Sequence, residues 1–365
     1  MGEGDAEGLV FVKQKLPSYG QMPPVAFQAS DVQLASSGPR MVIMGGQRRG
    51  ITGEMWIFDT NGDGWMQVQP DTANGFTATI PERTQSTLVA LGVEPQTSTL
   101  VFGGYVLNVG EANDLWRSDI SPDPNTSMPV AAHTKIEAGG TPPCPRYGHS
   151  ATIVEQSMIV IGGQNGTDQF SDVWSLSIDP YVWSVISTEG PAPTPRSQHT
   201  ATLVDGQILV LGGFNRKERV LGDAHMLDIS NKSAIWRSWE VTTGLMPPPR
   251  AQHTATLHPD GHHIYIFGGY DGEKNHKDLW LMNVPDAAAA ELRCSVKPEA
   301  RSRHSSHIIG SQLYVFCGHD GMKPHLSEVW TLEVDDVKGH LARAFDELQS
   351  NRKVEEEDKK NDDDD

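Results

Sequence analysis

The sequence has few basic residues and no long apolar run. It holds 29 lysines and arginines against 47 aspartates and glutamates, which gives a formal net charge of −18 over 365 residues. This acidic excess argues against nucleic-acid binding, because phosphate contacts need clustered lysine and arginine. No stretch approaches the ~20 consecutive apolar residues that a membrane-spanning helix requires. We therefore expect neither a nucleic-acid partner nor membrane insertion.

Cysteine is also scarce. Cys144, Cys294 and Cys317 are the three cysteines, and no Cys-x-x-Cys spacing occurs. This count excludes a disulfide framework and a zinc knuckle. Residues 1–8 are acidic and lack the apolar centre of a secretory signal, so we expect them to be disordered. These features favour a cytoplasmic protein, with the cytoskeleton or the cilium as alternative sites.

Glycine and proline are abundant, with 36 and 24 residues respectively. Such a composition is typical of short strands joined by tight turns. An apolar run that ends in a glycine pair recurs at intervals of 49 to 59 residues, and a repeat of this period indicates one structural unit per copy. The glycine pairs are Gly45–Gly46, Gly103–Gly104, Gly162–Gly163, Gly212–Gly213 and Gly268–Gly269, and the sixth copy has Cys317 followed by Gly318.

Two further segments accompany the glycine pairs. Upstream lies an Arg-x-x-His or Arg-x-x-Ser segment, which begins at Arg83, Arg146, Arg196, Arg250 and Arg301. Downstream lies an acidic residue followed two positions later by Trp56, Trp116, Trp174, Trp280 and Trp330. The first unit departs from the arginine pattern at residues 25–28, and the fourth has His225 where tryptophan is expected. Turn formers such as Asp205–Gly206 separate the apolar runs, so each unit predicts four short strands.

This combination of motifs resembles the kelch repeat family, and the resemblance covers residues 9–335. It implies an all-β fold, a six-bladed β-propeller of four-stranded antiparallel blades that forms one domain. The sixth unit ends after its third strand, near Val334. We therefore expect residues 9–16 to supply the missing outer strand and to close the ring, because an open ring would leave an unpaired sheet edge.

The segment 336–350 changes character, because Val337, Leu341, Phe345 and Leu348 recur at helical spacing on one face. We expect a short helix that packs on the edge of the propeller, and a docking helix for another subunit is the alternative. Residues 351–365 are nearly all charged, which predicts a disordered acidic tail.

The arginines are the leading candidates for partner binding. Each opens the strand nearest the axis, so the five should surround one mouth of the central channel, and a guanidinium group can hold a carboxylate through two parallel N–H groups. In kelch proteins that recognise peptides this mouth binds acidic or C-terminal carboxylate ligands, so the resemblance implies an acidic peptide segment as a candidate partner. The alternative is that each arginine bonds loop carbonyls and holds the blades together. We expect further partner contacts from the neighbouring Arg48, Tyr105, Tyr147, Gln198, Gln252, Tyr270 and Arg303.

No catalytic residue, cofactor site or metal site is expected. His149, His199, His253 and His304 close four of the arginine segments, and the resemblance places them in packed inner strands, where we expect them to bond neighbouring backbone. Glu218, Asp223 and His225 slightly resemble the iron-binding triad of the plant specifier proteins, but their spacing differs. The sequence has no phosphate-binding loop, nucleophile elbow or His-Glu-x-x-His motif.

The sequence therefore predicts a non-catalytic scaffold or adaptor that binds a protein partner through the propeller loops. A subunit of a cytoskeletal, axonemal or trafficking assembly fits this description. A substrate receptor of a ubiquitin ligase that recognises an acidic or C-terminal peptide is the alternative, and a metal-dependent enzyme on a kelch propeller is the weakest reading.

Overall fold

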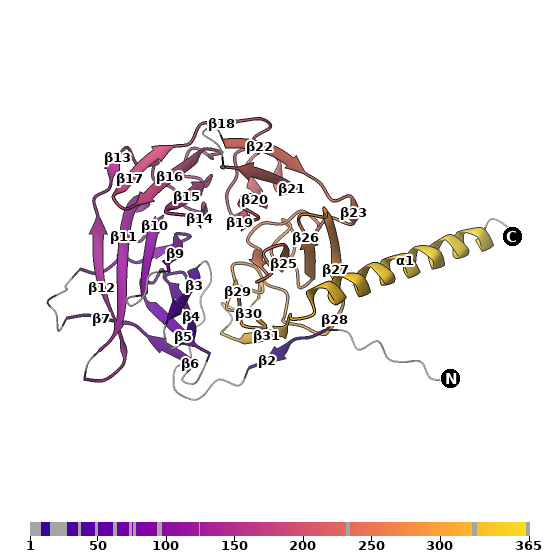
Figure 1. Ribbon diagram of the computed structural model, residues 1–365, viewed down its shortest axis with the longest axis horizontal. Helices are drawn as coiled ribbons and strands as arrows, with labels where there is room; N and C mark the ends of the chain where they lie inside the picture. Colours follow the sequence, from indigo (N-terminus) through magenta and orange to yellow (C-terminus); the bar gives the residue numbers. More distant parts are fainter. Residues whose placement is uncertain are drawn as a thin grey trace.

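The computed structural model describes residues 9–362 apart from 15–27, 36–37, 48–49, 61–63, 73–74, 76–77, 93–96, 124, 231–233 and 323–326. Six antiparallel sheets of four or more strands stand around one central axis (Figure 1). Each sheet is one blade, and its four main strands follow chain order from the axis outward, except that the outer strand of blade six comes from the N-terminus. The expected six-bladed β-propeller is confirmed.

Blades one to three share this arrangement, and short apolar or alternating runs form their strands as the sequence pattern predicted. Their main strands are β3 (Ala29–Ala35), β4 (Gly38–Met44), β5 (Met55–Asp59) and β6 (Gly64–Gln67) in blade one, β9 (Thr87–Leu91), β10 (Thr97–Val106), β11 (Gly110–Pro122) and β12 (Pro129–Ile136) in blade two, and β14 (Ser150–Val154), β15 (Ser157–Ile161), β16 (Val173–Ile178) and β17 (Tyr181–Val185) in blade three. The short β8 (Arg83–Thr84) also pairs with β10.

Blades four to six repeat the pattern. Their main strands are β19 (Thr200–Val204), β20 (Gln207–Asn215), β21 (Arg219–Asp228) and β22 (Ala234–Trp239) in blade four, β24 (Thr254–Leu257), β25 (His263–Phe267), β26 (Leu279–Asn283) and β27 (Ala288–Leu292) in blade five, and β29 (Ser305–Ile309), β30 (Gln312–Phe316), β31 (Val329–Glu333) and β2 (Val12–Lys13) in blade six.

Short parallel strands cover the outer edges of most blades. Each follows the outer strand of one blade and pairs with the outer strand of the next, which protects an edge that would otherwise be open. These strands are β7 (Gln69–Pro70), β13 (Gly139–Gly140), β18 (Thr188–Glu189), β23 (Thr243–Gly244) and β28 (Cys294–Val296), the last of which pairs with β1 (Leu9–Val10).

The N-terminal segment closes the ring, as expected. Strand β2 pairs antiparallel with β31, and Val12 lies opposite Thr331. Between β1 and β2, Phe11 is 1% exposed and lies in the core shared by blades five and six. The Lys13 ammonium donates to the Glu328 carboxylate. Residues 15 and 16 of the predicted strand lie outside the described residues.

The apolar clusters mostly lie between neighbouring blades rather than within one. In one such cluster, Ile159 and Ile161 of β15 pack with Ile208 and Val210 of β20. Burial of apolar surface contributes about 25 cal/mol per Å², so most of the stabilisation arises where two blades meet. A blade therefore depends on its neighbours for its core.

The glycine pairs occupy positions that exclude a side chain. Gly163 has a φ of +93°, and a Cβ atom there would lie 2.8 Å from the Cβ of His149. A residue with a side chain would clash and would also be strained in the left-handed region. Cys317, which replaces the first glycine in the sixth unit, adopts a φ of 60° nevertheless.

Helix α1 (Val337–Asp362) follows β31 and packs by its first half on blades five and six (Figure 1). Val337 and Leu341 are buried, and Phe345 and Leu348 pack against the same cluster, so the predicted apolar face is the packed face. The helix bounds extend beyond the predicted end at residue 350. The side chains of residues 351–365 lie outside the described residues, and the disorder of this tail stays a prediction.

Candidate functional site

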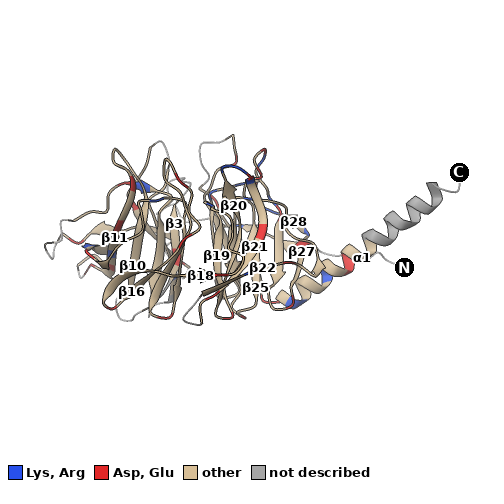
Figure 2. Cartoon of the chain, turned by 90° about the horizontal axis from the view of Figure 1, so that it is seen from above, with Lys and Arg blue, Asp and Glu red and all other residues tan. Residues whose placement is uncertain are grey.

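Connections between strands fall on two faces, because successive strands alternate in direction. The mouth face carries the segments that begin at Arg83, Arg146, Arg196, Arg250 and Arg301 and the loops that follow the glycine pairs. The turn face carries the tight turns between first and second strands, such as Asp205–Gly206, and the turns between third and fourth strands. Figure 2 shows the ring edge-on, with α1 beginning at its lower side.

Each of the five arginines is buried inside its own blade. Arg146 is 0% exposed. Its Nη1 and Nη2 donate to the two carboxylate oxygens of Asp172 at 2.7 and 2.9 Å, and its Nη1 also donates to the carbonyl of Gly162 at 2.9 Å. The equivalent carboxylate partners are Asp114 for Arg83, Asp223 for Arg196, Asp278 for Arg250 and Glu328 for Arg301.

This burial corrects the placement expected for Arg83, Arg146, Arg196, Arg250 and Arg301. They are at most 1% exposed, and a guanidinium group that already holds a carboxylate and a carbonyl cannot reach a ligand without breaking the blade. Removal of one partner from a buried ion pair costs about 3–5 kcal/mol. The arginines therefore belong to the framework, which is the alternative that the sequence left open.

The electrostatics of the pairs agree with this role. Burial raises the pKa of Asp114, but the hydrogen bonds and the positive charge of Arg83 outweigh it, so that this pKa lies below its usual value. The same balance lowers the pKa of Asp278, which pairs with Arg250. Asp114 and Asp278 thus stay ionised, and their pairs with arginine keep the charged form.

In the units that carry both residues, the tryptophan of the motif shares the carboxylate with the arginine. The Nε1 of Trp174 donates to Asp172 at 2.7 Å, and the Nε1 of Trp280 donates to Asp278 at 2.7 Å. In the fourth unit, where tryptophan is missing, His225 Nε2 lies 2.9 Å from Asp223. His225 therefore takes the place of the tryptophan, and its partner is the framework carboxylate.

Four histidines, one each at the start of blades three to six, join neighbouring blades. His149 Nε2 hydrogen-bonds the hydroxyl of Thr87 in blade two at 3.0 Å, and His199 bonds Ser150 in blade three at 2.9 Å. His253 and His304 bond Thr200 and Thr254 in the same manner. The structural role is as expected, but the partners of Nε2 are side-chain hydroxyls rather than backbone groups.

A chain of backbone hydrogen bonds runs around the mouth of the channel. The N–H of Gly148 donates to the carbonyl of Gln85 at 3.0 Å, and Gln198 donates to Gly148 at 2.7 Å. Gln252 then donates to Gln198 at 2.9 Å, and Arg303 donates to Gln252 at 3.0 Å. All five residues have positive φ angles between 55° and 65°, and the N–H groups of the last four point toward the preceding blade.

We call Gln85, Gly148, Gln198, Gln252 and Arg303 the mouth ring, and its four side chains form a second chain of hydrogen bonds. Arg303 Nε donates to the amide oxygen of Gln252 at 3.0 Å, and Gln252 Nε2 donates to Gln198 at 2.8 Å. Gln198 Nε2 donates to Gln85 at 3.1 Å. The amides lie across the channel mouth above a cavity of about 140 Å³, to which Gln28 also contributes. The structure therefore brings Gln198, Gln252 and Arg303 together at the channel mouth, and their contact with a partner stays a prediction.

The predicted tyrosines separate into two groups. Tyr105 is 40% exposed, and its ring lies edge-to-face on Tyr147 at a centroid distance of 6.1 Å. Tyr270 lies on another blade and donates its hydroxyl to the carbonyl of Gly272 at 2.7 Å. Arg48 lies outside the described residues.

Sequence reasoning missed two exposed residues next to Tyr105. Leu107 and Val109, in the turn of the β10–β11 hairpin, are 38% and 77% exposed. The sequence signal was present, because Tyr105-Val-Leu-Asn-Val109 is apolar in a loop where the other units carry polar residues. The mouth face thus carries an apolar patch (Tyr105, Leu107, Val109 and Tyr147) beside the polar mouth ring.

No group of three or more metal-binding side chains occurs among the described residues. Glu218, Asp223 and His225 do not form such a group, because Asp223 is held by Arg196 and His225. No helix within the described ranges is long and apolar enough to cross a membrane.

Comparison with known proteins identifies the fold family. The model of the KLHDC2/KLHL20/DRC7 Kelch-repeats domain matches residues 31–242 and 232–353. Host cell factor 1 of Homo sapiens is 27% identical over 276 residues, which are 73% of this chain and 11% of that protein. Tip elongation aberrant protein 1 of Schizosaccharomyces pombe is 26% identical over 194 residues, covering 52% of this chain and 16% of that protein.

A third relative is the dynein alpha chain of the flagellar outer arm of Chlamydomonas reinhardtii, 36% identical over 154 residues that make up 40% of this chain and 3% of that protein. The chain thus spans only a small part of these relatives, at most 16% of their length. The family model, in contrast, covers almost the whole propeller. This chain belongs to the Kelch-repeats domain family.

Proposed function

We propose that this protein is a non-catalytic scaffold or adaptor that binds a protein partner on its mouth face. The observation that carries the proposal is the apolar patch, where Val109 is 77% exposed and Tyr105 is 40% exposed. Apolar side chains that gather on an exposed surface mark interaction sites. Tyrosine in particular supplies a rigid anchor for a partner.

The neighbouring mouth ring gives this surface its polar part. Tyr147 directly precedes Gly148 of the ring, so the aromatic pair and the amide chain adjoin. An apolar centre beside amide and guanidinium groups is typical of protein interfaces. Arg303 carries the positive charge of the mouth ring. Because a guanidinium group binds carboxylates, it favours an acidic segment in the partner.

The buried face of α1 bears on the alternative role in a ubiquitin ligase. Leu341 is 7% exposed and packs in the cluster of blades five and six, so this apolar face is occupied within the chain. We therefore favour the scaffold. The similarity to a flagellar dynein chain supports a cytoplasmic location within a cytoskeletal or axonemal assembly as part of the same proposal.

The test begins with crosslinking mass spectrometry in native cells, which names the partner and the crosslinked residues. Affinity capture of that partner is then compared for the full chain and for Val109→Asp. Val185→Asp is the matched control, because Val185 is 60% exposed on the outer strand β17. We expect Val109→Asp to reduce capture at least tenfold and Val185→Asp to leave it unchanged. Equal capture by both variants would place the interface elsewhere.

A further inference from the structure

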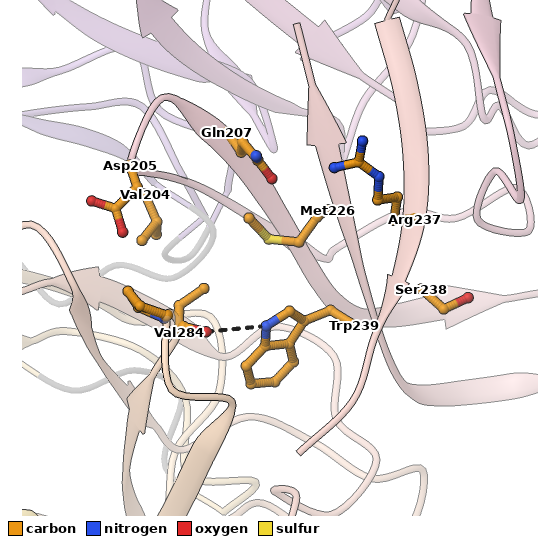
Figure 3. A pocket seen from close by; sticks show the side chains of 9 residues that line it. Val204, Asp205, Gln207, Met226, Arg237, Ser238, Trp239 and Val284 are labelled. Atoms are coloured by element: carbon orange, nitrogen blue, oxygen red, sulfur yellow. Dashed lines mark hydrogen bonds between the residues drawn. The ribbon is translucent and has the colours of Figure 1, made fainter. Parts of the chain in front are cut away.

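A pocket of about 330 Å³ opens between blades four and five, toward the turn face. It lies at the small end of the range for ligand pockets. Its lining comes from the Asp205 turn, from the outer strands of blade four and from the turn after β26 (Figure 3). The lining residues that matter here are Val204, Asp205, Met226, Arg237, Trp239 and Val284.

The base of the pocket is apolar and fixed. Val204 is 1% exposed and Val284 is 6% exposed. The indole Nε1 of Trp239 donates to the carbonyl of Val284 at 3.3 Å, which holds the ring against blade five (Figure 3). Met226 packs on the same cluster, and its thioether can adapt to a range of apolar shapes.

The equivalent groove one blade further on is filled by α1. Met226 lies opposite Arg237 across β21 and β22, and the same register in blade five places Leu281 opposite Ala290. Leu281 and Ala290 are 0% exposed and lie in one cluster with Val337, Leu341 and Ala344 of the helix. The groove between blades five and six is therefore a helix-binding groove.

The tryptophan follows the same correspondence. Trp239 lies opposite Ala224 in blade four, as Leu292 lies opposite Leu279 in blade five. Leu292 is 2% exposed beneath the helix cluster, whereas Trp239 in the open groove is only half-buried. The two grooves thus share one geometry, and in the described part of the chain only the second carries a helix.

Charge distinguishes the open groove from the filled one. Arg237 replaces the small Ala290, and its Nη1 lies 3.9 Å from Asp228, the outer limit of an ion pair. Asp205, on the opposite side of the pocket (Figure 3), lies 3.0 Å from His262. The guanidinium group therefore remains the charge best placed to meet an incoming ligand.

We propose that this groove binds an amphipathic helix of a second protein partner. The helix inserts an apolar side chain between Met226 and Trp239 and presents an acidic side chain to Arg237, a helix-in-groove mode of recognition. This site is separate from the mouth face. The propeller would therefore hold two proteins at once, one on each face, which goes beyond the single interface proposed above.

Two synthetic 15-residue amphipathic peptides test the proposal. They share one stripe of leucines, and their polar flanks carry glutamate in one peptide and lysine in the other. The full chain is labelled with ¹³C-methyl methionine, and the Met226 signal is assigned by its loss in Met226→Leu. We expect the glutamate peptide to shift the Met226 signal and to bind at least tenfold more tightly than the lysine peptide.

The variant Arg237→Glu should reverse this preference, whereas Val109→Asp should leave both affinities unchanged. An unshifted Met226 signal at millimolar glutamate peptide would overturn the proposal. Equal binding of both peptides would overturn it as well, because Arg237 would then select nothing. An unshifted Met226 signal or equal binding of both peptides would leave the proposed interface on the mouth face untouched. That interface is tested separately, by the capture of its partner with Val109→Asp.

Discussion

Mild acid should destabilise the propeller through the four buried histidines that join neighbouring blades. Burial, with the charge of the neighbouring arginine, lowers the pKa of His149, His199 and His253 to about 3. The same causes place the pKa of His304 well below its usual value. A histidine with a lowered pKa in the folded state takes up its proton only when the chain unfolds, so stability is lost as the pH falls below about 6.5.

The magnitude follows from proton linkage. Between pH 7 and pH 5.5 each of the four histidines favours the unfolded chain by about 1.3 kcal/mol. Asp31 opposes them, because burial raises its pKa to about 6, and it therefore takes up a proton in the folded state. This proton uptake stabilises the folded state by about 0.8 kcal/mol over the same pH range. For these five groups the net loss is about 4 kcal/mol, a large part of the typical stability of a domain.

The assay is thermal unfolding of the full chain at pH 7.0 and pH 5.5 at one ionic strength. A loss of about 4 kcal/mol lowers the melting temperature of a ring of this size by roughly 6 °C. His199→Gln is the matched variant, because blade one carries Gln28 at this position of its motif. It should reduce the shift by about a third. A melting temperature that stays within 1 °C over this pH range would refute the reasoning.

Three further predictions concern the blade framework. Arg250→Ala should cost about 3–5 kcal/mol, measured by chemical denaturation, because it leaves the Asp278 carboxylate, which is only 15% exposed, beside an empty site. Gly163→Ala should destabilise far more than Gly206→Ala in the same assay. Both glycines have positive φ, but a Cβ atom at Gly163 would lie 2.8 Å from His149, whereas one at Gly206 has nothing within 4 Å. Phe11→Ala should cost about 3–5 kcal/mol in thermal unfolding, since the ring is 1% exposed where the propeller closes; an unchanged midpoint would show that closure contributes little.

The repeat itself made the architecture predictable. Six copies of one motif indicated six equivalent units, and the positive φ angles of Gly163 and the other paired glycines give the physical reason for the recurring glycine. The closing strand was also predictable, because the sixth unit lacked a fourth strand and residues 9–13 supplied an unmatched one. These inferences used local periodicity, which a sequence displays directly.

The role of the arginines was harder to predict for a physical reason. Arg146 and Asp172 are 26 positions apart, and each motif was recognised separately. Arg146 lies in the segment before β14 and Asp172 lies directly before β16, so only the pairing of β14, β15 and β16 brings the two side chains together, and no periodicity reports such a contact. The open groove between blades four and five could not be predicted from the sequence either. Its equivalence to the groove that α1 fills becomes apparent only when Met226 is compared with Leu281, which lies beneath the helix.

The shared core of the two termini constrains the order in which the chain folds. Phe11 leaves the ribosome early, but the residues with which it packs, such as Leu332 and Leu341, are synthesised more than 300 residues later. N-terminal parts of a chain usually fold first during synthesis, yet this strand has no place to pack until the last blade of the ring is made. Phe11 therefore stays exposed while the other blades are synthesised. A chaperone that shields this short apolar strand would protect the nascent ring until the last blade arrives.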